Sequence, residues 1–198
     1  MKKFKTKKSK RKILKKSKVT LDAIIENEIK TNFLRKKFSN EIIKHAESIN
    51  YEITKSHKNL AHIDFVTIDG DDSKDFDDAV WATKKNDLFE IMVAISDVSY
   101  FIKENDALDI EAKKRGNSFY FPNKVIPMFP EKISNDICSL VPNKKKLCIV
   151  VNIILDKKGK IINSKVFRAF IVSKARLTYN EVENHINNNN SIKPKLAL

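Results

Sequence analysis

Six aspartates lie within ten residues of this chain, in the segment Asp69-Gly70-Asp71-Asp72-Ser73-Lys74-Asp75-Phe76-Asp77-Asp78. An apolar run, Phe65-Val66-Thr67-Ile68, precedes the segment, and a second one, Ala79-Val80-Trp81, follows it. Because apolar runs of this kind favour burial, they predict that the carboxylates are held in place between two anchored segments. Carboxylates that lie close together repel one another, and a hard cation such as Mg²⁺ relieves that repulsion. The segment therefore predicts a magnesium site.

The order of strand, loop and strand indicates which carboxylates can meet. Asp69 ends an apolar strand and Gly70 allows a tight turn, so Asp75, Asp77 and Asp78 return on the far side of the loop. We therefore expect these four carboxylates to face one another. Such a group could hold one or two metal ions that bind a phosphodiester, convert a water into hydroxide and stabilise the leaving oxygen.

Three other interpretations of the acidic segment compete with this one. An EF-hand needs Gly at loop position 6 and Glu at position 12, but a loop counted from Asp71 has Phe76 and Ala82 there. A phosphatase of the haloacid-dehalogenase type would use Asp69 as its nucleophile. That fold leaves the later aspartates unexplained and expects a helix next, where this chain predicts a strand hairpin. A solvated acidic turn is the third interpretation, and the flanking apolar runs argue against it.

The positive charge of the chain is concentrated at its N-terminus. Residues 1–18 hold ten lysines, one arginine and no acidic residue, which is most of the net charge of +14. A block of like charge cannot form a core, so this arm is expected to be disordered when free and to bind RNA or DNA phosphates in a salt-sensitive way. A solubilising extension is the alternative. The residues expected to contact RNA are Lys2, Lys3, Lys7, Lys8, Lys10, Arg11, Lys12, Lys15 and Lys16.

Composition excludes several classes of protein. Cys138 and Cys148 match no metal-binding spacing, so two reduced thiols are expected. The longest apolar runs, residues 91–95 and 147–151, are too short for a membrane span or a signal peptide. These features predict a cytoplasmic protein with no membrane segment and no small organic cofactor.

The hydrophobic pattern changes between helical and strand periods, which predicts an α+β fold with a mixed or antiparallel sheet, β-hairpins and flanking helices. Asn86-Asp87 supplies a hairpin turn between two apolar strands. Gly116 ends a helix that Asp106 begins, and Thr178 with Glu181 forms a capping box. The other predicted elements are helices near residues 21–29, 39–49 and 131–140, strands at 62–69, 79–82 and 88–95, an extended segment at 118–122 and a hairpin over 147–172.

Three segments are predicted to lack regular structure. Residues 51–60 are polar and are expected to form a connector, and residues 96–100 are expected to leave a strand as a loop. Residues 125–130 contain two prolines and are expected to form a rigid apolar loop. These segments should link the regular elements without adding a helix or a strand.

Residues 67–80 closely resemble the signature of the ribonuclease II / ribonuclease R catalytic domain. The resemblance extends in order from about Asn32 to Val182, and ribonuclease R is the nearer branch. Further segments that resemble family motifs are residues 93–100, 115–122, 126–130 with Cys138 and Leu140, and 175–179.

This resemblance implies a 3′-to-5′ exoribonuclease that uses Mg²⁺ to hydrolyse single-stranded or structured RNA to 5′-nucleoside monophosphates. Asp69, Asp75, Asp77 and Asp78 match the acidic metal-site positions. Asp77 and Asp78 are also the implied catalytic residues, with Asp78 the one most needed for the chemical step. Tyr120 matches the aromatic that packs against the terminal nucleotide, and such stacking is worth about 1–3 kcal/mol for any base.

The chain departs from the family pattern in several places. A short basic arm stands where family enzymes carry RNA-binding barrels, and no segment matches their later arginine-rich region, second aromatic or C-terminal barrel. Arg115, Arg168 and Arg176 are present, but the sequence places none of them at a scissile phosphate. Asp71 and Asp72 fall at variable family positions and receive no role.

The sequence therefore predicts the N-terminal part of a ribonuclease II-type catalytic domain, shortened at both ends. The predicted parts are an arm over residues 1–18, a helical lead-in over 19–60, a partial catalytic domain over 61–186 and a low-complexity tail over 187–198. A catalytically inactive remnant that binds RNA through its arm stays open as an alternative. A metal-dependent phosphatase is a more distant one.

Overall fold

The computed structural model describes residues 19–188 of the chain. The predicted basic arm and nearly all of the predicted tail lie outside these residues. The chain divides between Lys36 and Lys37 into two compact units. This boundary falls inside the predicted lead-in over residues 19–60, so its two helices belong to different units.

The described part of the first unit contains one helix, α1 (Leu21–Thr31). Thr20 caps the helix, because its hydroxyl accepts a hydrogen bond of 3.2 Å from the backbone N–H of Ala23. Lys36 forms an ion pair with Glu26. The helix predicted from the spacing of apolar residues is confirmed.

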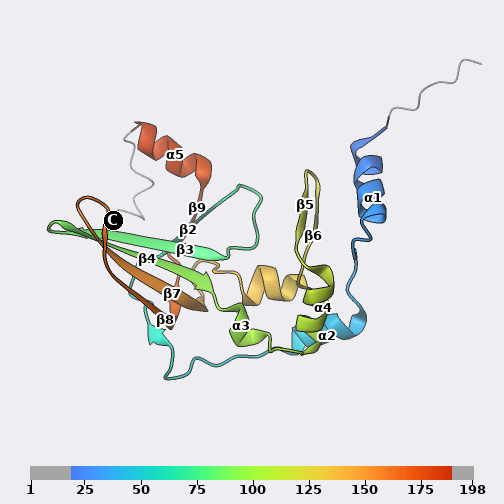
Figure 1. Ribbon diagram of the computed structural model, residues 1–198, viewed down its shortest axis with the longest axis horizontal. Coiled ribbons are helices and arrows are strands. Elements are labelled where there is room, and N and C mark those ends of the chain that lie inside the picture. The colour runs from blue at the N-terminus through green and yellow to red at the C-terminus, as the bar shows by residue number, and fades with distance from the viewer. Residues whose placement is uncertain (1–18, 189–198) are drawn as a thin grey trace, which may run out of the picture. The chain divides into compact units, whose positions relative to one another are not determined.

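The second unit is built on a seven-stranded sheet with the strand order β1-β8-β7-β4-β3-β2-β9 (Figure 1). Neighbouring strands are antiparallel, except that β1 pairs with β8 and β2 with β9 in parallel. The mixed sheet of an α+β fold is therefore confirmed. The strands are β1 (Lys58–Asn59), β2 (Val66–Asp69), β3 (Asp78–Lys85), β4 (Leu88–Ser96), β7 (Lys145–Asp156), β8 (Ile161–Val172) and β9 (Ala175–Thr178).

Two long hairpins, β3–β4 and β7–β8, form the centre of this sheet. The first turns at Asn86-Asp87, where Asn86 has a φ of 57°. The second turns near Gly159, which has a φ of 79°. Positive φ is accessible to Asn and to Gly at little cost, which explains why these residues occupy the turns. Both predicted hairpins are confirmed, with strands longer than expected.

In residues 37–188, five helices accompany the sheet: α2 (Asn40–Ser48), α3 (Val98–Phe101), α4 (Ala107–Arg115), a π-helix η1 (Lys132–Ile137) and α5 (Tyr179–Asn188). The predicted caps are confirmed. Ser39 accepts a hydrogen bond from Ile42 N–H at 3.3 Å, and Asp106 accepts one from Asp109 N–H at 2.8 Å. Gly116 follows α4 with a φ of 75°, as a helix-ending glycine requires.

The core of the second unit consists of two buried clusters. One cluster contains Phe65, Phe76 and Ala79, which lie before, within and after the acidic segment. The other joins α2, α4 and η1 to residues of β7 and β8. Because both ends of the acidic segment enter the core, the prediction that apolar runs anchor it is confirmed.

Three segments predicted to be irregular contain short regular elements. Residues 51–60 include β1, which joins the sheet, and Leu60 N–H donates to Phe170 C=O at 3.0 Å. Residues 96–100 lead into α3, because the Asp97 side chain caps that helix. Residues 125–130 begin with the end of β6 (Lys124–Ile126), which forms a small second sheet with β5 (Phe119–Phe121). Each correction arises from a partner that the local sequence does not reveal.

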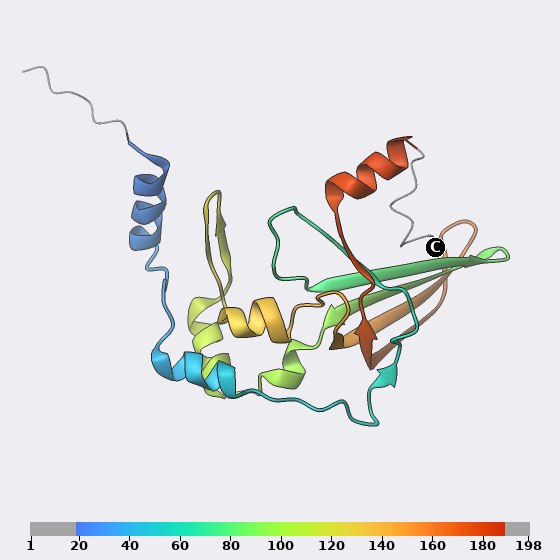
Figure 2. The ribbon, with the colours of Figure 1, turned by 180° about the vertical axis from the view of Figure 1, so that it is seen from behind.

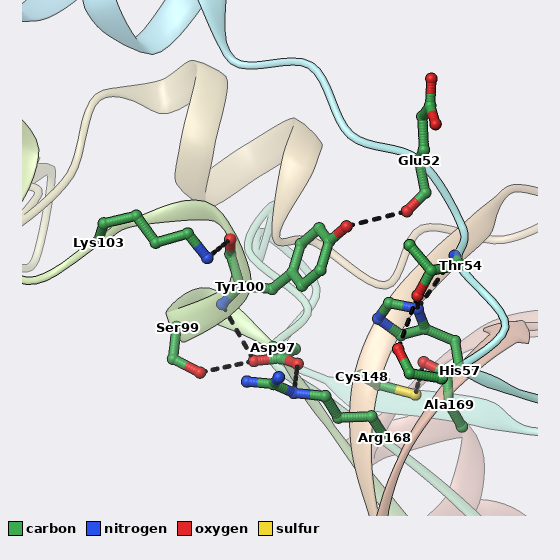
Figure 3. A network of polar contacts seen from close by, with 11 residues as sticks. Glu52, Thr54, His57, Asp97, Ser99, Tyr100, Lys103, Cys148, Arg168 and Ala169 are labelled. Carbon is green, nitrogen blue, oxygen red and sulfur yellow. Dashed lines mark hydrogen bonds and ion pairs between the residues drawn. The ribbon is translucent and has the colours of Figure 1, made fainter.

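A network of polar contacts holds the connector at residues 51–57 beside α3 (Figure 3). The Tyr100 hydroxyl donates to the Glu52 carbonyl at 3.0 Å, and the Thr54 backbone N–H donates to His57 Nδ1 at 3.3 Å. Within residues 19–188, no helix is long and apolar enough to cross a membrane.

Candidate functional site

The acidic loop, residues 70–77, joins two neighbouring antiparallel strands. Asp69 is the last residue of β2 and Asp78 is the first residue of β3. The pairing of Val66 with Val80 fixes the register of the two strands and brings their loop ends together. The strand, loop and strand order predicted for the aspartates is therefore present.

Arg176 on β9 fixes the start of the acidic loop. One of its terminal nitrogens donates to the carbonyls of Gly70 at 2.8 Å and Asp71 at 2.5 Å. Its guanidinium carbon also lies 5.5 Å from the centre of the Phe76 ring. A charged donor on two consecutive carbonyls restricts how the backbone can leave Asp69.

Ser139 fixes the end of the loop. Its hydroxyl accepts a hydrogen bond of 3.0 Å from Phe76 N–H and donates one of 3.1 Å to the Lys74 carbonyl. Leu140 N–H donates to the Phe76 carbonyl at 2.8 Å, and Phe76 itself is buried. The loop is thus held at both ends, with its acidic side chains between the two anchors.

The four aspartates predicted to bind metal influence one another electrostatically. Burial and then the negative charge of Asp78 raise the pKa of Asp69, while the nearby Thr67 hydroxyl and Arg176 act in the opposite direction. The pKa of Asp77 is raised too, because the surrounding protein shields its carboxyl group and because Asp75, Asp78 and Asp69 repel its charge. Asp77 as a whole residue is nevertheless exposed.

The donor set suits a hard cation. Asp69 Oδ2 is buried and has no hydrogen-bond partner within residues 19–188. No three His, Cys, Asp or Glu side chains among these residues converge closely enough to form a complete metal-binding group. Mg²⁺ is nevertheless commonly held by one or two carboxylates, with water and substrate phosphate completing its shell. The residues present therefore fit Mg²⁺, and the four-aspartate site stays a prediction.

A cleft of about 1250 Å³ lies beside the acidic loop. It exceeds the roughly 300–1,000 Å³ of typical small-ligand pockets, which favours an extended ligand. Of the four predicted metal residues, all within the described part of the chain, Asp75 is the one that lines it. The lining comprises residues 70–76, 118, 120–125, 127, 131, 134, 135 and 176.

Tyr120 stands on β5 at the opposite wall of this cleft. Its hydroxyl donates a hydrogen bond of 2.9 Å to Asp75 Oδ2, although 65% of the residue is exposed. Burial of the hydroxyl, and then the hydrogen bond to Asp75, raise the pKa of Tyr120, so the phenol stays protonated. The structure thus places the aromatic predicted to pack against a nucleotide in contact with a predicted metal ligand.

The three arginines that the sequence did not assign to the active site have different surroundings in the structure. Arg115 is buried and pairs with Glu111 at 2.9 Å, whereas Arg168 lies 2.9 Å from Asp97. Arg176 lines the cleft and holds the acidic loop. Sequence reasoning missed the contributions of Arg176 and Ser139. The sequence did offer an indication of each. Arg176 lies inside the segment 175–179, which resembles a family motif, and Ser139 lies between Cys138 and Leu140, which also match the family.

Comparison with known proteins gives consistent matches. The RNB domain family matches residues 57–197. Ribonuclease R of Mycoplasmopsis pulmonis is 44% identical over 142 residues, which are 72% of this chain and 20% of that protein.

Two solved structures of Mycoplasma genitalium RNase R are also similar, one in complex with ribose-methylated single-stranded RNA and one with double-stranded RNA. Each has a TM-score of 0.83 and 31% identity, and the matches cover 87% of this chain but 28% and 32% of those chains. The chain therefore spans about a fifth of the length of the curated relative and about three tenths of the solved ones.

Proposed function

Because this chain belongs to the RNB domain family, we propose that it forms part of the catalytic domain of a cytoplasmic 3′-to-5′ exoribonuclease of the ribonuclease R type. Its substrate is single-stranded or structured RNA, and its products are 5′-nucleoside monophosphates. The solved relatives bind single-stranded and double-stranded RNA, which supports this choice of substrate.

The single observation that carries the proposal is the state of Asp69 in the acidic loop. Its buried Oδ2 has no hydrogen-bond partner in residues 19–188, and the neighbouring Asp78 and Asp75 are negatively charged. A buried anionic oxygen without a partner is costly unless a cation binds it. Two anchors, Arg176 and Ser139, nonetheless hold this loop in place, so the unfavourable arrangement is fixed.

In the proposed mechanism, Mg²⁺ would be held by carboxylates from the group Asp69, Asp75, Asp77 and Asp78, and Asp77 and Asp78 are the proposed catalytic residues. Bound there, the metal supplies Lewis-acid chemistry that activates water and stabilises the leaving oxygen. The cleft holds the RNA strand. Tyr120 packs against the terminal base, which gives affinity without sequence preference.

The decisive experiment follows hydrolysis of 5′-labelled single-stranded RNA with Mg²⁺ by the complete 198-residue chain. We expect stepwise shortening from the 3′ end by the wild type and a loss of about 100-fold or more in Asp78→Asn, as for removal of one positioned electrostatic group. Asp64→Asn is the matched control, because Asp64 is exposed and lies outside the cleft.

Activity that survives Asp78→Asn would contradict the catalytic assignment. Absence of activity in all three proteins would favour the alternative of a chain that binds RNA without cleaving it.

The basic arm is tested separately by deleting residues 1–18. This deletion should weaken RNA binding strongly at low salt and less at high salt, because phosphate contacts depend on counterion release. Fluorescence anisotropy measures both conditions, and unchanged affinity at low salt would refute the role of the arm.

A further inference from the structure

The hydroxyl of Tyr120 joins the two walls of the cleft. The β5–β6 hairpin forms one wall and the acidic loop forms the other, and the two lie side by side in both ribbon views (Figures 1 and 2). The hydrogen bond from Tyr120 to Asp75 spans 2.9 Å between residues 45 positions apart. A side chain of the β5–β6 wall thus contacts a predicted metal ligand in the wall formed by the acidic loop.

The backbone around Tyr120 holds it in this position. Phe119 pairs with the buried Ile126 on one face of the small hairpin, and side chains alternate along a strand, so Tyr120 points from the other face. Ser118 adds a second anchor, because its hydroxyl accepts a hydrogen bond of 2.9 Å from Met128 N–H. The Tyr120 hydroxyl therefore meets Asp75 from a fixed base.

Asp75 links the cleft to the carboxylate group. It lines the cleft, and its charge also acts on Asp69 and Asp77. An ionised carboxylate can only accept hydrogen bonds, so the phenol donates to Oδ2 and leaves Oδ1 for another partner. This arrangement sets the direction in which the free oxygen of Asp75 points.

We propose that the Tyr120 hydroxyl is a positioning group that orients Asp75 for a divalent cation. The inference rests on the proposed function and extends it, because it assigns the hydroxyl and the ring of Tyr120 different roles. The ring packs against the nucleotide, and the hydroxyl prepares the cation site. Hydrogen bonds from outer groups to ligating carboxylates typically change metal affinity about 10–100-fold when they are lost.

The separation is tested with Tyr120→Phe, which keeps the ring, and Tyr120→Ala, which removes both parts. Binding of Mn²⁺ to the complete chain is measured by titration calorimetry, and RNA binding is measured by anisotropy in EDTA. We expect Tyr120→Phe to weaken Mn²⁺ binding about 10-fold or more while RNA affinity in EDTA stays unchanged. Tyr120→Ala should weaken both. Tyr179→Phe is the matched control, because Tyr179 is 63% exposed and lies outside the cleft.

Asp78→Asn identifies the cation site in the same titration. If Asp78→Asn abolishes Mn²⁺ binding and Tyr120→Phe binds like the wild type, the inference is overturned and the proposed function stands. If the wild type binds no Mn²⁺, or binds it regardless of Asp78, both are overturned. A loss of RNA affinity in Tyr120→Phe as large as in Tyr120→Ala would also overturn the separation of hydroxyl and ring. Circular dichroism of each variant confirms folding.

Discussion

Asp69 is the last residue of β2 and Asp97 directly follows β4 of the same sheet, yet their electrostatic surroundings are opposite. Asp97 is fully buried, and its Oδ1 accepts hydrogen bonds from the Ser99 hydroxyl at 2.7 Å and Tyr100 N–H at 3.2 Å (Figure 3). Its Oδ2 has no hydrogen bond but lies 2.9 Å from Nε of Arg168, with which it forms an ion pair. Asp69 instead has a buried Oδ2 without a hydrogen-bond partner in the described chain and negative neighbours.

The arginine near each aspartate explains the difference. Arg168 is directed at the carboxylate of Asp97, so it neutralises a buried charge. Arg176 is directed at the carbonyls of Gly70 and Asp71, so it fixes the acidic loop and only partly offsets the charge of Asp69. The Asp97 region therefore contributes to the stability of the fold, whereas the acidic loop keeps a charge that a ligand can satisfy.

Replacement of Asp97 by Ala should have the largest effect on stability. The substitution removes the cap of α3 and the ion-pair partner of Arg168. We expect the free energy of unfolding to fall by about 2–4 kcal/mol, which is less than for a fully buried ion pair because Arg168 is half exposed. Urea unfolding measures this loss. Asp97→Asn is the control, because it keeps an acceptor for Ser99 and Tyr100. Equal stability of the two variants would show that the hydrogen bonds at Oδ1 contribute nothing.

Arg176→Met should cost less, about 1–3 kcal/mol, because it removes two charge-assisted hydrogen bonds to the loop. It should also speed hydrogen exchange at Ser73 N–H, which donates to the Gly70 carbonyl. Arg168→Met is the matched comparison, since it acts on Asp97 and should leave exchange at Ser73 unchanged. If both variants accelerate exchange equally, the two regions are not independent.

Mg²⁺ should stabilise the chain through the acidic loop alone. At ten times its Kd, a ligand adds about 1.4 kcal/mol, which corresponds to a rise in Tm of roughly 3–6 °C for a chain of this size. Scanning fluorimetry with and without Mg²⁺ measures the rise. It should disappear in Asp78→Asn and persist in Asp97→Asn. A rise that survives in Asp78→Asn would place the cation elsewhere.

Asp77→Asn should have the smallest effect on stability, and it should stabilise the fold, whereas Asp97→Ala destabilises it. The pKa of Asp77 is raised in the folded protein, so folding favours the protonated carboxyl group. This favourable state is present at low pH and is lost as the pH rises through the raised pKa, where the ionised carboxylate lowers the stability of the fold. At pH 7 in EDTA, the neutral asparagine should therefore raise Tm by about 1–2 °C. Below the ordinary pKa of an aspartate the difference should vanish. A lower Tm at pH 7 would contradict repulsion within the loop.

Local features of the fold could be predicted from the sequence. The caps at Ser39 and Asp106, the turn at Asn86 and the capping box of Thr178 and Glu181 all join residues within a few positions of one another. The order of the aspartates at Asp69 and Asp78 followed from the apolar runs around them. These patterns need no knowledge of distant segments.

The features that could not be predicted depend on distant partners. Ser139 reaches Phe76 across 63 positions, and Arg176 reaches Gly70 across 106. The strands β1 and β9 are short and lie at the two edges of the sheet, and each pairs in parallel with one strand that is distant in the sequence. The resemblance placed Tyr120 and Asp75 at one site, but their hydrogen bond could not be predicted, because it depends on how the β5–β6 hairpin stands beside the loop.

The parallel pairing of β2 with β9 affects when the candidate site can form during synthesis. Val66 pairs with Ala175, and the arginine that fixes the loop follows at the next position. A nascent chain that has emerged only to β8 contains all the aspartates but lacks the strand that completes their support. Such non-local contacts also form late in folding, because a long loop must close first. Assembly of this acidic centre is therefore delayed until the ribosome has released Arg176, which lies 106 positions after Gly70.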